Sequence, residues 1–166
     1  MGIISNFFKL YYDDSSEPSR DKFFDIILKG IGSIIINGKY AEKILELTKG
    51  VISIDKKCWY TGDYRTIAAS SLSGANIVLF KPFENIPKDK FRVVGADFRV
   101  SGLDILKKLP AIIMGKDISN EGILYEDATE LGIFNEKQSL YTLDGEMYNG
   151  KNLKIELGPK LNFIKV

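Results

Sequence analysis

YTLDGEMYNGKNLKIELGPKLNFIKV, residues 141–166, is the stretch that decides the fold. Its short runs of alternating apolar and polar residues are typical of half-buried strands. Two dipeptides that favour tight turns, Asp144-Gly145 and Asn149-Gly150, interrupt these runs. The stretch therefore predicts successive antiparallel strands, over residues 139–143, 152–157 and 161–166.

The same kind of pattern continues upstream of this stretch. Short apolar runs separated by turn residues, such as Thr61-Gly62-Asp63, favour an antiparallel meander. The runs cover residues 43–48, 51–55, 58–60, 64–71, 76–80, 90–98 and 123–134. Residues 43–48 fit either a strand or the end of a helix, because their apolar positions match neither period well.

Apolar residues at three- and four-residue spacing predict two amphipathic helices, over residues 21–36 and 101–114. Ser101, with Asp104 three residues later, forms a weaker version of a capping box for the second helix. Pro110 should kink this helix or restart it. Together with the strands, this order predicts a mainly β (α+β) single domain over residues 1–166. We expect a distorted two-sheet antiparallel β-sandwich with about two helices.

The composition excludes several kinds of catalytic site. The chain contains no histidine, which removes Ser-His-Asp and Cys-His catalysis and His-ligated zinc. Acid–base chemistry is left to carboxylates, Lys, Tyr or Cys58, and a bound metal would be an oxygen-ligated ion such as magnesium or calcium. The formal net charge of +1 gives no support for nucleic-acid binding. No apolar run approaches the ~20 residues of a membrane span, so a cytoplasmic protein is expected.

Three segments carry a resemblance to a known family. They are PKDKFRVV (residues 87–94), GLDILKKLPAIIMGKDI (residues 102–118) and YTLDGE (residues 141–146). In this order they resemble the turn and strand, the leucine-rich helix and the ending of the C-terminal domain of the diacylglycerol kinase and sphingosine kinase family of lipid kinases. Lys90 stands where the family usually has a glycine. The resemblance runs from about Val51 to the C-terminus. The first 50 residues resemble the family only loosely.

The resemblance implies a distorted β-sandwich packed against a separate N-terminal nucleotide-binding domain, with the active cleft between the two. The complete enzyme would transfer the γ-phosphate of ATP, with magnesium, to a lipid hydroxyl. This sequence contains no GGDGT motif, by which the family binds ATP, and no Walker-type glycine loop. We therefore expect that the nucleotide-binding domain is absent from this chain and that the chain is inactive alone. The apolar residues 3–12 likewise indicate that a further segment or a partner precedes Met1.

The expected partners are a lipid substrate, the missing nucleotide-binding domain and, by peripheral contact, a membrane. The alternative function is a non-catalytic lipid-binding or protein-interaction module.

Asp144 and Glu146 are the candidate catalytic residues. The resemblance implies that Glu146 reaches the active cleft and that Asp144 supports it. A carboxylate pair at a cleft could hold a magnesium–water network, or it could accept the proton of the attacking lipid hydroxyl. Gly145 would permit the sharp reversal between them. The alternative is that these residues form an ordinary, solvated hairpin turn.

Asp89 is the candidate metal ligand. The resemblance implies a structural magnesium at this position, helped by carbonyls of residues such as Ile86 and Phe91. The alternative is an aspartate that only forms a turn. Basic residues are candidates for contacts to phosphate or to an anionic lipid surface, with solvated faces as the alternative. These residues are Arg65, Lys81, Arg92 and Arg99.

Overall fold

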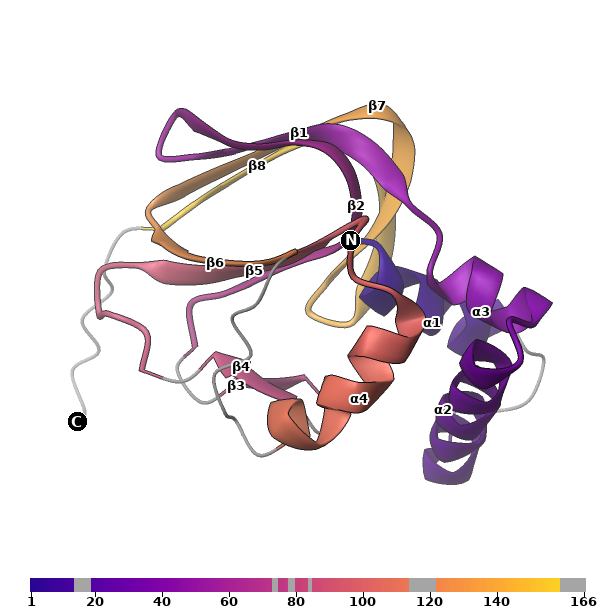
Figure 1. Cartoon of the computed structure of the whole chain (residues 1–166). Coiled ribbons are helices and arrows are strands. Elements are labelled where there is room, and N and C mark those ends of the chain that lie inside the picture. Colours follow the sequence, from indigo (N-terminus) through magenta and orange to yellow (C-terminus); the bar gives the residue numbers. More distant parts are fainter. Residues whose placement is uncertain (14–18, 73–74, 78–79, 84, 114–121, 159–166) are drawn as a thin grey trace, which may run out of the picture.

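Six antiparallel strands form the main sheet of the computed structural model, in the order β6-β5-β2-β1-β7-β8 (Figure 1). A second, two-stranded sheet consists of β3 and β4. The strands are β1 (Thr48–Ile54), β2 (Lys57–Ser70), β3 (Ala75–Ile77), β4 (Phe80–Phe83), β5 (Phe91–Asp97), β6 (Ile123–Ala128), β7 (Glu130–Leu143) and β8 (Glu146–Glu156). The structure describes residues 1–13, 19–72, 75–77, 80–83, 85–113 and 122–158. The expectation of a mainly β fold with two antiparallel sheets is confirmed.

The main sheet curls, so that its two halves face each other. The first half of β2 pairs with β1 and the second half pairs with β5, with an irregularity between Tyr64 and Thr66. Only Thr129 separates β6 from β7, although these strands lie far apart in the strand order. Figure 1 shows β5 and β6 in one layer and β1 and β8 in the other. One curved sheet therefore supplies both layers.

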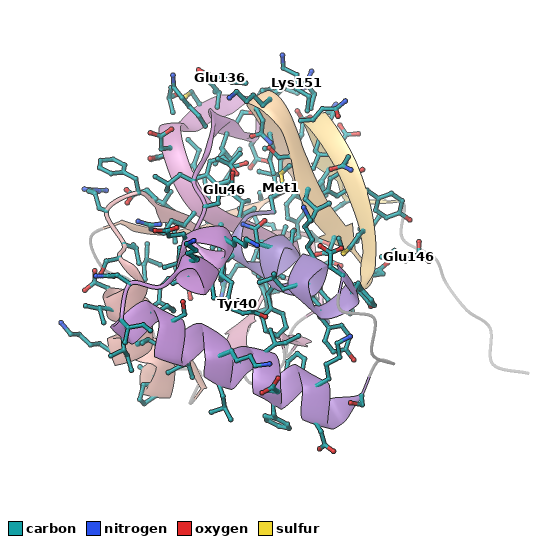
Figure 2. The ribbon with its side chains drawn as sticks, turned by 90° about the vertical axis from the view of Figure 1, so that its right-hand side faces the viewer. Met1, Tyr40, Glu46, Glu136, Glu146 and Lys151 are labelled. Carbon is teal, nitrogen blue, oxygen red and sulfur yellow. The ribbon has the colours of Figure 1, made fainter. Side chains whose placement is uncertain are left out.

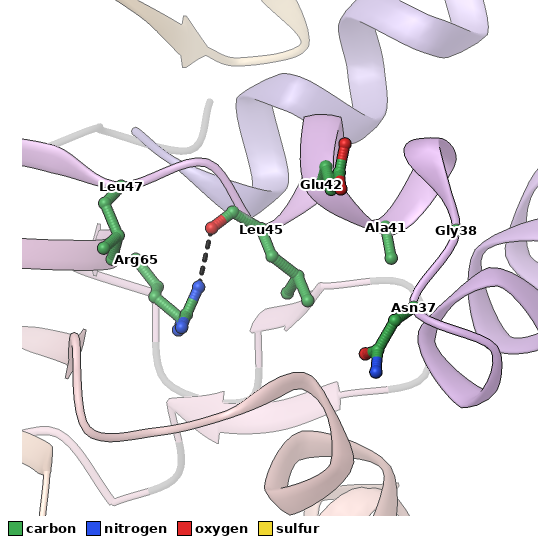
Figure 3. A pocket seen from close by; sticks show the side chains of 7 residues that line it. All are labelled: Asn37, Gly38, Ala41, Glu42, Leu45, Leu47 and Arg65. Carbon is green, nitrogen blue, oxygen red and sulfur yellow. Dashed lines mark hydrogen bonds between the residues drawn. The ribbon is translucent and has the colours of Figure 1, made fainter.

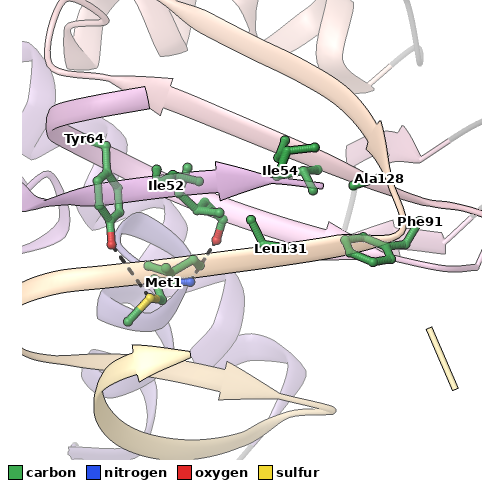
Figure 4. Packing of buried hydrophobic residues seen from close by; sticks show 10 residues of the cluster. Met1, Ile52, Ile54, Tyr64, Phe91, Ala128 and Leu131 are labelled. Carbon is green, nitrogen blue, oxygen red and sulfur yellow. Dashed lines mark hydrogen bonds between the residues drawn. The ribbon is translucent and has the colours of Figure 1, made fainter. Parts of the chain in front are cut away.

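Side chains from both layers fill the space between them. In β1, Ile52 and Ile54 are buried whereas Val51 is exposed, which is the alternation of a strand with one face on a core. Tyr64 is fully buried. The buried cluster consists of Met1, Ile52, Ile54, Tyr64, Ile67, Phe91, Val93, Ala128, Leu131 and Ile133 (Figure 4).

Met1 lies inside this core, with only 7% of its surface exposed. Its amine donates a hydrogen bond to the carbonyl oxygen of Ile67 at 2.9 Å. Its sulfur lies 3.7 Å from the Tyr64 hydroxyl oxygen (Figure 4). The sulfur also accepts a hydrogen bond of 3.7 Å from the Asn135 amide. Burial lowers the pKa of the amine from 8.0 to about 5, because the charged form loses the water that stabilises it.

Four helices lie beside the sheets in the part of the chain that the structure describes. They are α1 (Ile3–Asp13), α2 (Arg20–Ile35), α3 (Lys39–Ile44) and α4 (Gly102–Ile113). The sequence prediction of about two helices is correct for α2 and α4 and misses α1 and α3. The apolar residues of α1 pack on α2, where the rings of Phe7 and Phe23 meet edge to face at 5.2 Å. Residues 43–48 are mostly helix and loop, so the helical alternative is correct for them.

Serine hydroxyls cap two of the helices, and the cap predicted at Ser101 is present. Ser19 caps α2, because its hydroxyl accepts a hydrogen bond from the backbone N–H of Lys22 at 3.2 Å. At α4, the Ser101 hydroxyl accepts from the Asp104 N–H, and the Asp104 carboxylate accepts from the Ser101 N–H at 3.0 Å. This is the reciprocal geometry of a capping box. Pro110 lies inside α4, which continues to Ile113 without a break.

Two of the predicted turns are wrong. Thr61-Gly62-Asp63 lies inside β2, where Gly62 pairs with Gly50. Asn149-Gly150 lies inside β8 and pairs with the far end of β7. In both cases a long neighbouring strand supplies backbone hydrogen bonds that outweigh the local turn preference. The strand predicted over residues 161–166 falls outside the described residues.

Candidate active site

The β7–β8 turn holds both candidate catalytic residues. Leu143 pairs with Glu146, which leaves Asp144 and Gly145 as a two-residue loop. Both loop residues have positive φ angles, 49° at Asp144 and 88° at Gly145. This is the pattern of a type I′ hairpin turn, for which Asp-Gly is a favoured sequence. The predicted turn is confirmed, and it fixes Asp144 and Glu146 within one tight reversal of the chain.

Glu146 is oriented by a neighbour on its own strand. The Tyr148 hydroxyl donates a hydrogen bond of 2.5 Å to Oε2 of Glu146. This bond is the first cause of the raised pKa of Tyr148, because the proton is held between the two oxygens. The Tyr148 ring stacks on that of Tyr141 across the hairpin, with centroids 5.5 Å apart. Tyr148 was not a candidate from the sequence, although side chains two residues apart on a strand share a face.

The candidate pair faces solvent in this chain. Asp144 and Glu146 are both exposed. Figure 2 shows Glu146 at the margin of the molecule, well away from Glu136 and Lys151 on the same hairpin. Two carboxylates in this position could accept a proton from a substrate or hold a hydrated cation. Either role needs a second surface that covers the turn and excludes water.

Asp89 lies elsewhere in the fold. It is exposed on a turn in which the Lys90 N–H donates to the carbonyl of Pro87, directly before β5. Phe91 pairs with Ala128, close to the beginning of β7, whereas the Asp144 turn follows the end of that strand. The 14 residues of β7 separate the two places by ~40 Å along the strand, at ~3.3 Å per residue. The structure therefore does not bring Asp89 together with Asp144 and Glu146.

A search for metal-binding groups covers the described residues only. Within these residues, no group of three or more His, Cys, Asp or Glu side chains comes together in a way that could hold a metal ion.

The basic candidates differ in their surroundings. Arg92 forms a two-bond ion pair with Asp127, at 2.8 and 3.0 Å. Arg99 pairs with the buried carboxylate of Asp97 at 2.6 Å. The structure does not describe the side chain of Lys81. Arg65 lines a pocket.

Comparison with known proteins gives matches at the level of structure. No protein-family model and no curated protein sequence matches the chain. A crystal structure of a "putative diacylglycerol kinase" from Bacillus anthracis str. Sterne matches with a TM-score of 0.53 at 14% sequence identity, covering 76% of this chain. The chains share a fold. A second structure described in the same words matches with a TM-score of 0.52, also at 14% identity and 76% coverage.

The match covers only part of each bacterial structure. This chain spans 42% of the first and 40% of the second. The resemblance to one domain of a lipid kinase, drawn from three short segments of sequence, is thus supported by a shared fold. None of the described helices is long and apolar enough to cross a membrane.

Proposed function

We propose that this chain is a single domain that forms the C-terminal part of a diacylglycerol kinase-like lipid kinase. The complete enzyme transfers a phosphoryl group from ATP to a lipid hydroxyl. The observation that carries this proposal is the Asp144-Gly145 turn with Glu146, on a fold shared with part of a bacterial protein described as a "putative diacylglycerol kinase". The activity of the chain depends on a nucleotide-binding partner, because the sequence has no glycine-rich phosphate loop.

In this proposal Glu146 acts as the general base. Its carboxylate takes the proton of the lipid hydroxyl while the hydroxyl oxygen attacks the γ-phosphorus of ATP. The bond from that phosphorus to the bridging oxygen breaks, and ADP leaves. Tyr148 holds Oε2 of Glu146, which leaves Oε1 to face the substrate. Asp144 places a second carboxylate on the same turn.

Magnesium is the metal that this chemistry implies, because it neutralises charge on the transferred phosphoryl group. A second, structural magnesium is assigned to Asp89, which lies away from the β7–β8 turn. Asp89 supplies one exposed carboxylate, so the remaining ligands would be backbone carbonyls and water, as magnesium accepts. This arrangement fits a weakly held, hydrated ion. We place the enzyme in the cytoplasm, where ATP is abundant, in peripheral contact with a membrane that carries its substrate.

The test is transfer of labelled phosphate from ATP to diacylglycerol. We expect no turnover from residues 1–166 alone. In a complete protein that contains this domain with a nucleotide-binding domain, Glu146→Gln should abolish turnover while the variant stays folded. The matched control is Glu136→Gln, on the same hairpin, where an exposed glutamate pairs with Lys49 at 2.8 Å. This control should keep turnover.

Each contrary result has a definite meaning. Unchanged turnover in Glu146→Gln refutes the assigned base, and clear turnover by residues 1–166 alone refutes the need for a second domain. A complete protein that binds diacylglycerol vesicles and never turns over would support the alternative, a non-catalytic lipid-binding module.

A further inference from the structure

A pocket of about 500 Å³ lies between α3, the loop that follows it and the middle of β2. Its lining residues are Asn37, Gly38, Ala41, Glu42, Leu45, Leu47 and Arg65 (Figure 3). This volume is within the range of small-molecule sites, ~300–1,000 Å³. The pocket is separate from the β7–β8 turn, because none of its lining residues belongs to β7 or β8.

Arg65 is the only cationic side chain among the lining residues. Its Nε donates to the carbonyl oxygen of Val100 and its Nη1 to that of Leu45, the latter at 2.7 Å. These contacts hold the guanidinium between the end of α3 and the segment before α4. They use two of its five N–H donors, so donors remain for a ligand.

The charge of Arg65 has no acidic partner among the described residues. Burial lowers the pKa of the Arg65 guanidinium, because the charged form loses water that stabilises it. The other two described arginines of the candidate set are paired, Arg92 with Asp127 and Arg99 with Asp97. A half-buried cation that lacks a counter-ion is unfavourable, and an anion that enters the pocket relieves that cost.

The rest of the lining is mixed. Figure 3 shows the side chains of Ala41 and Leu45 on the same side of α3. The side chain of Glu42 points to the opposite side. Leu47 adds a second leucine and is 42% exposed. The pocket thus combines a fixed cation with a short apolar wall.

We propose that this pocket binds an oxyanion attached to a short apolar group, with the Arg65 guanidinium on the oxyanion and Leu45 and Leu47 on the apolar part. Phosphate and carboxylate both match the forked donors of arginine. The inference does not rest on the proposed kinase function, because it concerns other residues and needs no nucleotide. A phosphorylated lipid is one source of such a group and a free organic phosphate is another.

The experiment is an NMR titration of the isotopically labelled chain with four probes: hexyl phosphate, hexanoate, inorganic phosphate and hexan-1-ol. We expect saturable shifts of the backbone amides of residues 37–47 with hexyl phosphate and hexanoate. Inorganic phosphate should bind at the same place but more weakly, and hexan-1-ol should not bind. Hexyl phosphate binding with no hexanoate binding would restrict the site to phosphates and still support it. Added vesicles of phosphatidate, compared with soluble hexyl phosphate, distinguish a lipid source from a free phosphate.

Three variants separate binding from structure. Arg65→Gln should weaken hexyl phosphate binding by about tenfold or more, through loss of charged hydrogen bonds. Glu42→Gln should strengthen it by about twofold to fivefold, because it removes a negative charge from the lining. Leu47→Ser should weaken binding of hexyl phosphate and leave that of inorganic phosphate unchanged.

The last two variants keep the test decisive if Arg65→Gln does not fold. Absence of saturable binding by the unsubstituted chain, hexan-1-ol binding as tightly as hexyl phosphate, or binding that ignores Glu42→Gln and Leu47→Ser would each overturn the proposal.

Discussion

The buried amine of Met1 predicts that the 166-residue chain loses stability between pH 8 and pH 5. The unfolded chain has an amine pKa near 8.0, whereas burial lowers the folded value to about 5. Between these values the unfolded state binds the proton more tightly, so protonation favours unfolding. The stabilisation is complete above pH 8 and is lost as the pH falls to 5. Three pKa units correspond to about 4 kcal/mol.

The composition makes this prediction easy to measure. The chain has no histidine, so no imidazole titrates in this range. Several carboxylates have lowered pKa values, and these groups titrate below pH 5; they include Asp55, Asp104 and Glu156. The assay is urea unfolding of the chain with a free Met1 amine, followed by the fluorescence of Trp59, the single tryptophan. Linear extrapolation at several pH values gives the free energy of unfolding.

The control is the same chain with an acetylated amine, which cannot gain a proton. Acetylation should lower stability at pH 8, since it adds bulk in a buried place. The unfolding free energy of the acetylated chain should be flat between pH 8 and pH 5. An equal slope in the free and acetylated chains would refute the reasoning, because the slope would then come from other groups.

Three further substitutions test the packing around the sheets. Tyr64→Phe removes the hydroxyl that donates to Asn135 at 2.8 Å and should cost ~1–3 kcal/mol in urea unfolding; a neutral result would mean that the buried amide finds another partner. Asp97→Asn breaks the pair of a buried carboxylate with Arg99 and should cost ~3 kcal/mol, seen as a lower thermal midpoint. Asp55→Ala removes the acceptor for two N–H groups and a hydroxyl at the β6–β7 junction. This substitution should destabilise the chain by ~1 kcal/mol at neutral pH. The difference from the unsubstituted chain should vanish in acid, because the Asp55 carboxyl, whose pKa is lowered by these hydrogen bonds, then becomes protonated.

Local features of the sequence were sufficient for the elements with strong local preferences. Helices α2 and α4 follow from apolar spacing and from hydroxyl caps at Ser19 and Ser101. The Asp144-Gly145 turn follows from the preference of this dipeptide for positive φ. Asn149-Gly150 has a similar preference and yet lies within a strand, because β7 extends far enough to pair with it. Pairing with a distant strand is not visible in a local pattern.

The candidate sites likewise combine features that have a local sequence signal with features that depend on distant parts of the chain. Asp144 and Glu146 became candidates through their position in the order of segments, but the hydrogen bond from Tyr148 to Glu146 was not predicted. The sequence named Arg65 and Arg92 as equal candidates. Their difference depends on contacts with distant parts of the chain, since Asp127 lies 35 residues from Arg92 and the carbonyl of Val100 lies 35 residues from Arg65.

The position of Met1 in the core sets an order for folding during synthesis. Met1 contacts Ile67 and Asn135, which are 66 and 134 positions further along the chain. The core around Met1 also requires β1 to pair with β7, and the paired residues of these strands lie more than 70 positions apart in sequence. Most of the 166 residues must therefore be made before Met1 can enter the core. Contacts of such long range slow folding, so Met1 remains without its partners in the core until β7 has been made, and a chaperone could bind it in that interval.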